Sequence, residues 1–320
     1  MNRESLRKTQ MMVQICQLYY EHNLPQKKIA DRFGISRSYV SKLLLEAKEQ
    51  GIVKIEIINP FELESPIENK IRSRFNLDKA IVVPVNTRDF MLKLEVIGES
   101  LSKYLYQIVE DNDIISVTWG ITLNVCSSKL IKKPVKNCVV TQLNGGLARA
   151  DKGVHVYEII NRFAAAFEAT PYYLNVPAIL DSHEIKDTII KDRHISDVLS
   201  FAESSNIAIF AAGEFGFNSA LVRDGYFSED EIQALLKKGV VGDICARFID
   251  INGNLVDSEF DKRVVGISLD SLRKKEYRIL LSAEDEYISG TYGALSGGLA
   301  NVLITDEKTA DALMAYSDTE

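Results

Sequence analysis

The chain has 320 residues, of which 46% are hydrophobic and 26% are charged, with 18 Gly and 7 Pro. This composition excludes a largely disordered chain and a collagen-like repeat, and the apolar runs fall short of the roughly 18 residues that a membrane helix needs. The four Cys form no C-x-x-C pair and the first residues are polar. We therefore expect a cytoplasmic protein with reduced thiols and no membrane partner.

Charge is distributed unevenly along the chain. The net charge of -7 argues against a general nucleic-acid binder. However, residues 1–58 carry ten Lys or Arg against six Asp or Glu, whereas the remainder carries 28 against 39. A small basic segment before a large acidic one is typical of a DNA-binding domain attached to a regulatory domain, although so few charges also cluster by chance.

The segment from residue 11 onward has the spacing of a helix-turn-helix. Residues 11–20 carry apolar side chains at helical intervals, and Pro25 suits the first turn of a second helix. Counted from residue 26, Ala30, Gly34 and Val40 stand fifth, ninth and fifteenth. The motif needs a small residue, a residue that tolerates positive φ and a branched apolar residue there. A helical hairpin that merely packs is the alternative.

The second helix of this motif would present a polar face to DNA. Recognition helices contact base edges and phosphates through their amino-terminal half, and Ser36 also suits the N-cap of that helix. The candidate DNA contacts on the two helices are Gln26, Lys27, Ser36, Arg37, Ser38, Tyr39, Ser41 and Lys42.

A strand and a domain boundary are expected next. Gly51 suits the end of the second helix, and apolar residues alternate with charged ones over 53–57, which predicts a strand and hence a winged helix-turn-helix. Ser65 and Glu68 flank Pro66 in the pattern of a capping box. We place the DNA-binding domain at 1–58 and an effector domain at 59–320.

The second domain alternates short apolar runs with helical segments, which predicts an α/β fold with a Rossmann-like, mainly parallel sheet. The candidate strands are Ala80–Val85, Ile114–Trp119, Cys138–Leu143, Ile207–Gly213, Arg278–Ala283 and Asn301–Thr305. The candidate helices include Met91–Val109, Val154–Phe167, Ser228–Lys238 and Glu307–Tyr316.

Ligands of such sheets bind at the carboxyl ends of the strands, where two segments are candidates. Thr118, Trp119, Gly120 and Thr122 end one strand and begin a helix, whose first amides favour an anion such as a sugar phosphate. A second segment follows the next strand and offers amide side chains and exposed backbone N–H groups. It comprises Gln142, Asn144, Gly145 and Gly146. A tight turn and a flexible loop are the alternative interpretations of the two segments.

Two further acids follow strands or apolar runs. Gly213 and Glu214 end a strand, where a solvated loop acid is the favoured interpretation of Glu214 and an effector contact is the other. Asp243 stands among apolar residues and requires a partner or a ligand if it is buried. It can bind neighbouring sugar hydroxyls or pair with Arg247, and we include both residues in the candidate site.

The sequence lacks the common motifs for nucleotide binding, metal binding and serine-hydrolase catalysis. Neither a P-loop nor G-x-G-x-x-G occurs, the four His are dispersed, and there is no G-x-S-x-G elbow. We therefore expect no cofactor, no metal site and no catalytic residue.

Taken together, these segments resemble those of SorC-type sugar-responsive transcriptional regulators. The resemblance covers nearly the whole chain and rests on the helix-turn-helix segment together with "WGITL", "QLNGG", "VVGDICARFIDINGNLVD", "RVVGISLDSLR" and "ANVLITDEKTA". It implies a winged helix-turn-helix joined to a sugar-binding domain similar to sugar-phosphate isomerases. It also implies a homo-oligomer, a dimer or tetramer, that controls a carbohydrate operon by binding operator DNA.

Two positions depart from the family pattern. Some relatives carry a Lys that can form a Schiff base before the Gly pair, where this chain has Asn144, and many carry a Lys where this chain has Tyr287. We include Tyr287 among the effector contacts. Because both departures weaken the case for a phosphorylated effector, a sugar, a polyol and a sugar phosphate all stay open. A sugar-phosphate isomerase or deaminase is the alternative function.

Overall fold

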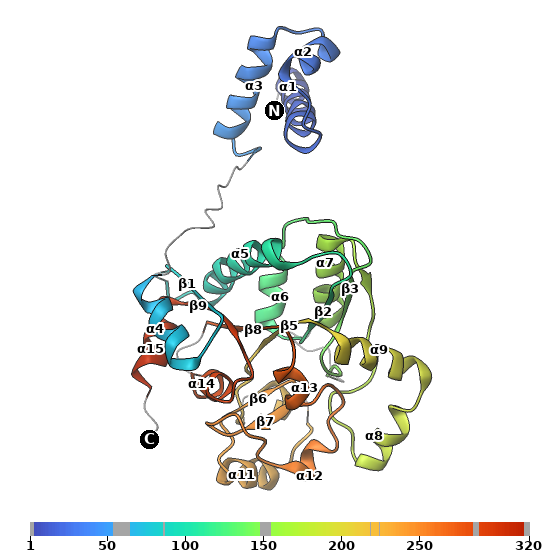
Figure 1. Ribbon diagram of the computed structural model, residues 1–320, viewed down its shortest axis with the longest axis vertical. Helices are drawn as coiled ribbons and strands as arrows, with labels where there is room; N and C mark the ends of the chain where they lie inside the picture. The colour runs from blue at the N-terminus through green and yellow to red at the C-terminus, as the bar shows by residue number, and fades with distance from the viewer. Residues whose placement is uncertain are drawn as a thin grey trace. The chain divides into compact units, whose positions relative to one another are not determined.

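The computed structural model describes residues 3–53, 65–85, 87–147, 155–217, 219–223, 225–283 and 288–316. The chain divides into two compact units, Met1–Leu63 and Glu64–Glu320, which we call the head and the body (Figure 1). None of the described helices has the length and apolar character needed to cross a membrane.

The described part of the head contains three α-helices and a short π-helix. They are α1 (Arg3–Cys16), η1 (Gln17–Glu21), α2 (Gln26–Phe33) and α3 (Arg37–Glu49). The helix expected over 11–20 is thus longer at its start, and its last residues are π-helical. A shared core of apolar side chains joins the helices and includes Met12, Ile15, Ile29, Val40 and Leu43.

The turn between α2 and α3 has the predicted chemistry. Gly34 adopts φ +63°, and the Ser36 hydroxyl accepts a hydrogen bond from the Tyr39 amide over 3.1 Å. Gly51, with φ +70°, follows the end of α3. The helix-turn-helix prediction is therefore confirmed. The strand predicted over 53–57 lies, beyond Val53, outside the described residues.

The body is built on a seven-stranded, all-parallel sheet with the order β1-β9-β8-β5-β2-β3-β4. All six predicted strands are present, but five of them end one or two residues earlier than expected. The strands are β1 (Lys79–Val83), β2 (Ile114–Val117), β3 (Val139–Gln142), β4 (Thr170–Pro171), β5 (Ile207–Ala211), β8 (Tyr277–Ser282) and β9 (Val302–Asp306).

Helices cover both faces of this sheet, which is why its strands are apolar on both sides. In the central strands, Ile207 and Ile209 face one core while Ala208 and Phe210 face the other. The first core holds α5 (Phe90–Ile108), α6 (Ile121–Ser127) and α7 (Val156–Phe167). The second holds α4 (Pro66–Phe75), α9 (Arg193–Ser204), α13 (Leu269–Arg273), α14 (Ile288–Ser296) and α15 (Glu307–Ala315).

A smaller lobe of the body has its own core of aromatic side chains, around Phe215, Phe227, Phe248 and Phe260. The antiparallel hairpin of β6 (Gly242–Ile244) and β7 (Arg247–Ile249) runs through it. The remaining short helices are α8 (His183–Ile189), α10 (Ala220–Arg223), α11 (Glu229–Lys237) and α12 (Ser258–Asp261). In Figure 1, β6, β7, α11 and α12 lie together on one side of the sheet.

Candidate functional site

A cavity of about 340 Å³ lies where the strand order of the sheet reverses. From β2 the chain proceeds to β3 and β4 on one side and then returns to β5 and β8 on the other. Such a reversal leaves a crevice at the carboxyl ends of the strands, the usual ligand site of open α/β sheets. The cavity is lined by Thr118, Trp119, Gly120, Ile121, Thr122, Asn144, Ala211, Ala212, Gly213, Glu214, Ser219, Leu221, Asp243, Cys245, Ala246, Leu281, Ser282, Ala283 and Thr291.

The segment after β2 forms one side of this cavity. Gly120 precedes α6 with φ +123°, a conformation that favours glycine. The Trp119 indole Nε1 donates a hydrogen bond to the Gly145 carbonyl over 2.8 Å. The indole therefore ties the segment after β2 to the segment after β3.

Asn144 contributes an amide group to the cavity. Its side chain is buried, and its Oδ1 has no hydrogen-bond partner among the described residues. The backbone around it is held by the segment 265–267, since Gly145 N donates to Val265 O and Ile267 N to Leu143 O, each over 3.0 Å. Because a buried polar atom without a partner is costly, Asn144 Oδ1 is a natural site for a ligand hydroxyl or a water.

Asp243 contributes a carboxylate at the start of the β6–β7 hairpin. Its Oδ2 accepts a hydrogen bond from Ala246 N over 2.9 Å, which holds a turn in which Cys245 and Ala246 both have positive φ. Its Oδ1 has no hydrogen-bond partner among the described residues. The pKa of Asp243 is raised to about 6, because the effect of burial exceeds the opposite effect of the hydrogen bond from Ala246 N. The Oδ1 atom of this carboxylate can therefore accept a hydrogen bond from a ligand.

The charges that line the cavity are negative. Glu214 and Asp243 line it, and none of its described lining residues is Lys, Arg or His. A buried cation lies next to the lining residue Ala283: Lys93 Nζ is 3.4 Å from the Ala283 carbonyl oxygen and 3.4 Å from Asp306 Oδ1. Sequence reasoning missed Lys93, because a single Lys within an amphipathic helix gives no signal of burial.

Three predicted contacts after β3, namely Gln142, Gly145 and Gly146, do not line this cavity. The Gln142 amide donates to Asn144 O over 3.1 Å and accepts from Leu174 N over 2.8 Å, so it is used within the protein. Gln142 and Gly146 border a second cavity of about 470 Å³. Gly145 allows close packing, because a Cβ there would lie 2.5 Å from the Pro177 carbonyl oxygen. Tyr287 lies outside the described residues.

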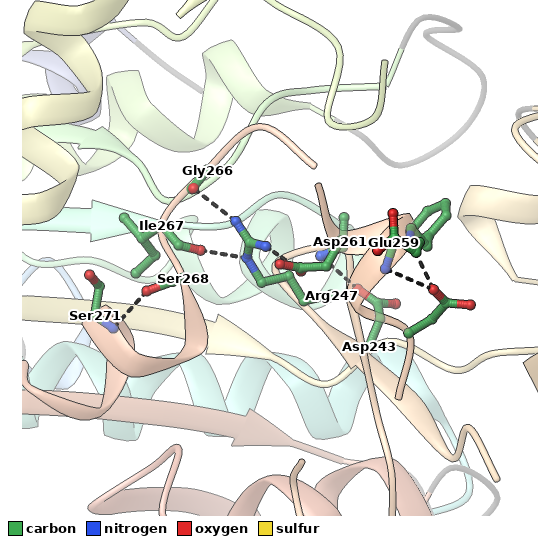
Figure 2. A network of polar contacts seen from close by, with 11 residues as sticks. Asp243, Arg247, Glu259, Asp261, Gly266, Ile267, Ser268 and Ser271 are labelled. Atoms are coloured by element: carbon green, nitrogen blue, oxygen red, sulfur yellow. Dashed lines mark hydrogen bonds and ion pairs between the residues drawn. The ribbon is translucent and has the colours of Figure 1, made fainter. Parts of the chain in front are cut away.

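Arg247 does not line the cavity either, and its partner is not Asp243. Figure 2 shows its guanidinium between the carbonyls of Gly266 and Ile267 and the carboxylate of Asp261. The Arg247 residue is 4% exposed. The alternative pairing of Asp243 with Arg247 is therefore not the one the structure has.

The predicted DNA contacts of the head gather at the start of α2 and α3. Lys27, Arg37 and Lys42 are exposed, as are the three serines, whereas Gln26 and Tyr39 are half-buried. Lys28 and Arg32 of α2 are also exposed. The sequence prediction did not include these two cations.

Comparisons with known proteins match both units. The Sugar-bind family model, which describes a sugar-binding domain, matches residues 59–315, and the model for region 4 of sigma-70 matches residues 11–50. The chain is 38% identical to the deoxyribonucleoside regulator of Bacillus subtilis strain 168, over 96% of this chain and 98% of that protein.

A second relative is also known as a solved structure. The sorbitol operon regulator of Klebsiella pneumoniae is 30% identical over 95% of this chain and 97% of its own length. The crystal structure of full-length SorC from that organism matches 96% of this chain and 98% of its own with a TM-score of 0.76. The similarity thus extends over the head and the body.

Proposed function

The chain belongs to the SorC family of sugar-binding transcriptional regulators, and we propose that it controls a bacterial carbohydrate-utilisation operon. Its relatives are regulators and not enzymes, so the isomerase or deaminase alternative is set aside. The observation that carries the proposal is the cavity at the strand reversal, in which Asn144 and Asp243 offer oxygens without protein partners.

The effector in this proposal is a sugar, a polyol or a sugar phosphate. A carboxylate oxygen and an amide oxygen accept hydrogen bonds from neighbouring hydroxyls, and the indole of Trp119 provides an apolar face for the C–H side of a sugar. A phosphate, if the effector carries one, would meet the backbone of 120–122. The proposed contacts that line the cavity are Thr118, Trp119, Gly120, Thr122, Asn144, Gly213, Glu214 and Asp243.

The head binds operator DNA in this proposal. The exposed face at the start of α3, with Arg37 and Lys42, contacts base edges and phosphates, and Lys27 contacts phosphate. Two recognition helices of a two-fold pair would enter successive major grooves about 34 Å apart, which requires a homodimer or a homotetramer. A protein that binds the bacterial chromosome works in the cytoplasm.

Control follows from differential binding. An effector that binds one arrangement of the oligomer more tightly shifts the population toward it, and only an arrangement with the correct spacing spans both half-sites. The effector therefore changes operator affinity without touching DNA.

Thermal unfolding tests the effector part of the proposal. Ribose, 2-deoxyribose, glucose and sorbitol are each compared with their phosphate esters, because a ligand of the folded state raises the melting temperature. Stabilisation by esters alone assigns the backbone of 120–122 to a phosphate. Stabilisation by free sugars alone assigns recognition to Asn144 and Asp243. If none stabilises, the proposed effector class is wrong.

DNA binding is tested separately. Duplexes are selected from a random pool with the full-length protein, and fluorescence anisotropy then measures affinity with and without the stabilising compound. A change in affinity on addition of the compound supports regulation. Failure to select any sequence would contradict the proposed DNA-binding role and leave the sugar result unaffected.

A further inference from the structure

Arg247 joins three parts of the body through one buried guanidinium. Its Nε donates to the Ile267 carbonyl over 2.7 Å, one terminal nitrogen donates to the Gly266 carbonyl over 3.0 Å, and the other pairs with Asp261 (Figure 2). The β6–β7 hairpin, α12 and the segment 265–267 therefore share this side chain. A planar group with donors in a fixed fork suits three acceptors in different directions.

The segment that Arg247 holds is also the one that supports the effector cavity. Val265 O and Ile267 N bond to the backbone of Gly145 and Leu143 on either side of Asn144. The contact is close, because a Cβ on Gly266 would lie 2.7 Å from Asn144 Cβ. The position of the Asn144 amide therefore depends on the position of residues 265–267.

Gly145 links the segment 265–267 to the indole of Trp119. Gly145 donates its N–H to Val265 and offers its carbonyl to Trp119 Nε1. On the other side, Arg247 begins β7 directly after the turn that Asp243 holds through Ala246 N. Arg247 is thus linked indirectly to Trp119, Asn144 and Asp243, because its own hydrogen bonds go to Asp261, Gly266 and Ile267.

We propose that Arg247 is a positioning residue of the effector cavity: it fixes residues 265–267, and through them the Asn144 amide and the Trp119 indole, in the geometry that binds a sugar. This inference rests on the proposed function for its sugar and assigns Arg247 a role that is not effector contact. Removal of its guanidinium takes these donors from the buried Ile267 carbonyl and the half-buried Gly266 carbonyl, and it should loosen residues 143–145.

The chain offers a matched control in Arg273. Its guanidinium also binds two carbonyls, those of Gly297 and Gly253, over 3.0 and 2.9 Å, and it pairs with Asp270 over 3.0 Å. Arg273 does not line the cavity. Arg273→Met therefore removes the same kinds of bonds elsewhere in the body, although the Arg273 side chain is 32% exposed and that of Arg247 is 5% exposed. Unfolding of both variants is therefore measured beside the readouts below, so that a loss of cavity geometry is distinguished from a general loss of stability.

The first readout needs no sugar. Trp119 is the single Trp of the chain, so acrylamide quenching of full-length protein reports its accessibility alone. We expect the quenching constant of Arg247→Met to rise about twofold, while Arg273→Met stays at the parent value. Arg247→Lys, which keeps the charge but lacks the fork, should fall between Arg247→Met and the parent.

The second readout is affinity for sorbitol or 2-deoxyribose, or for the phosphate ester of either, whichever stabilises the parent. We expect Arg247→Met to bind it about tenfold more weakly, since small displacements of binding groups are costly, and Arg273→Met to bind it normally. Selected DNA should bind both variants as it binds the parent when no sugar is present.

Two results would overturn the inference. One is an Arg247→Met protein with the quenching constant of Arg273→Met. The other is sugar affinity that stays within twofold of the parent while quenching changes, because the indole would then move without consequence for binding. If no sugar or ester stabilises the parent, the proposed effector class fails, whereas the quenching result still decides whether Arg247 positions the cavity.

Discussion

The backbone of Gly213 lies directly against the carboxylate of Asp243, where a Cβ on residue 213 would be 2.1 Å from Oδ1. The two residues also exchange backbone hydrogen bonds, from Gly213 N to Asp243 O over 2.8 Å and from Asp243 N to Gly213 O over 2.9 Å. Glycine at 213 therefore leaves room for an acid beside the cavity. The acid is kept in an environment where its charge is poorly solvated.

Asp243→Asn should stabilise the effector-free protein at neutral pH. The folded-state pKa of Asp243 is raised from 3.8 to about 6 by burial, so its ionised form costs stability as pH rises from about 4 to about 6. A shift of roughly two pK units corresponds to at most about 3 kcal/mol. We expect chemical unfolding to show that the free energy of unfolding of Asp243→Asn exceeds that of the parent by about 1–3 kcal/mol at pH 7.5, and that this difference shrinks toward zero near pH 4.

The same variant should bind the stabilising sugar more weakly, because an amide replaces the carboxylate that accepts its hydroxyls. A gain in stability with a loss of binding is the expected pattern for a group retained for function. Equal stability of parent and Asp243→Asn across this pH range would show that the carboxylate is not destabilising. Thr309→Ser, at a buried site outside the cavity, serves as the control for a conservative substitution.

Trp119 should report effector binding directly. Its indole lines the cavity and is the single one in the chain, so a sugar packed against it changes its emission intensity or wavelength. Titration of the stabilising sugar should give a saturable fluorescence change with the midpoint found by calorimetry. Trp119→Phe should abolish the optical change. An unchanged spectrum at saturating sugar would place the bound sugar away from this indole.

The head was predictable because its determinants are local. Gly34, Ser36 and Gly51 act on residues within one helical turn of themselves, and the buried face of α3 follows from apolar spacing. The main strands were likewise predictable from apolar runs. The two-residue strand β4 was not, since Thr170–Pro171 pairs only through its position beside β3.

The site was predictable in its location more than in its roles. The rule that ligands bind at strand ends selected Thr118–Thr122, Asn144 and Gly213, and the acid among apolar residues added Asp243; the fold brings them around one cavity. The strands end earlier than predicted because residues that follow them, such as Thr118 after β2, line the cavity instead of continuing the strand. The role of Arg247 could not be read from sequence, because its partners Asp261, Gly266 and Ile267 are 14 to 20 residues away.

The cysteines should be unreactive in the folded protein. All four are buried and free, and burial raises the pKa of Cys126, Cys138 and Cys245 to about 12. At pH 8 on the order of one thiol in 10⁴ is then ionised. Reaction with a chromogenic disulfide should therefore wait for denaturant and then release four equivalents. A fast native reaction that disappears in Cys245→Ser would show that solvent reaches Cys245 through the cavity that it lines.

Removal of Arg37 or Lys42 should weaken DNA binding because each side chain is expected to bind a phosphate. Both side chains are exposed on α3. Removing one cation that contacts a phosphate reduces the slope of log affinity against log salt concentration by about one. We expect Arg37→Ala and Lys42→Ala each to reduce affinity for selected DNA about three- to tenfold at moderate salt. Lys70→Ala, which removes an exposed charge from α4 of the body, should leave both affinity and salt slope unchanged. If the two head variants keep the salt slope of the parent, α3 does not contact the phosphates, and the DNA-binding face has to be sought around Lys28 and Arg32.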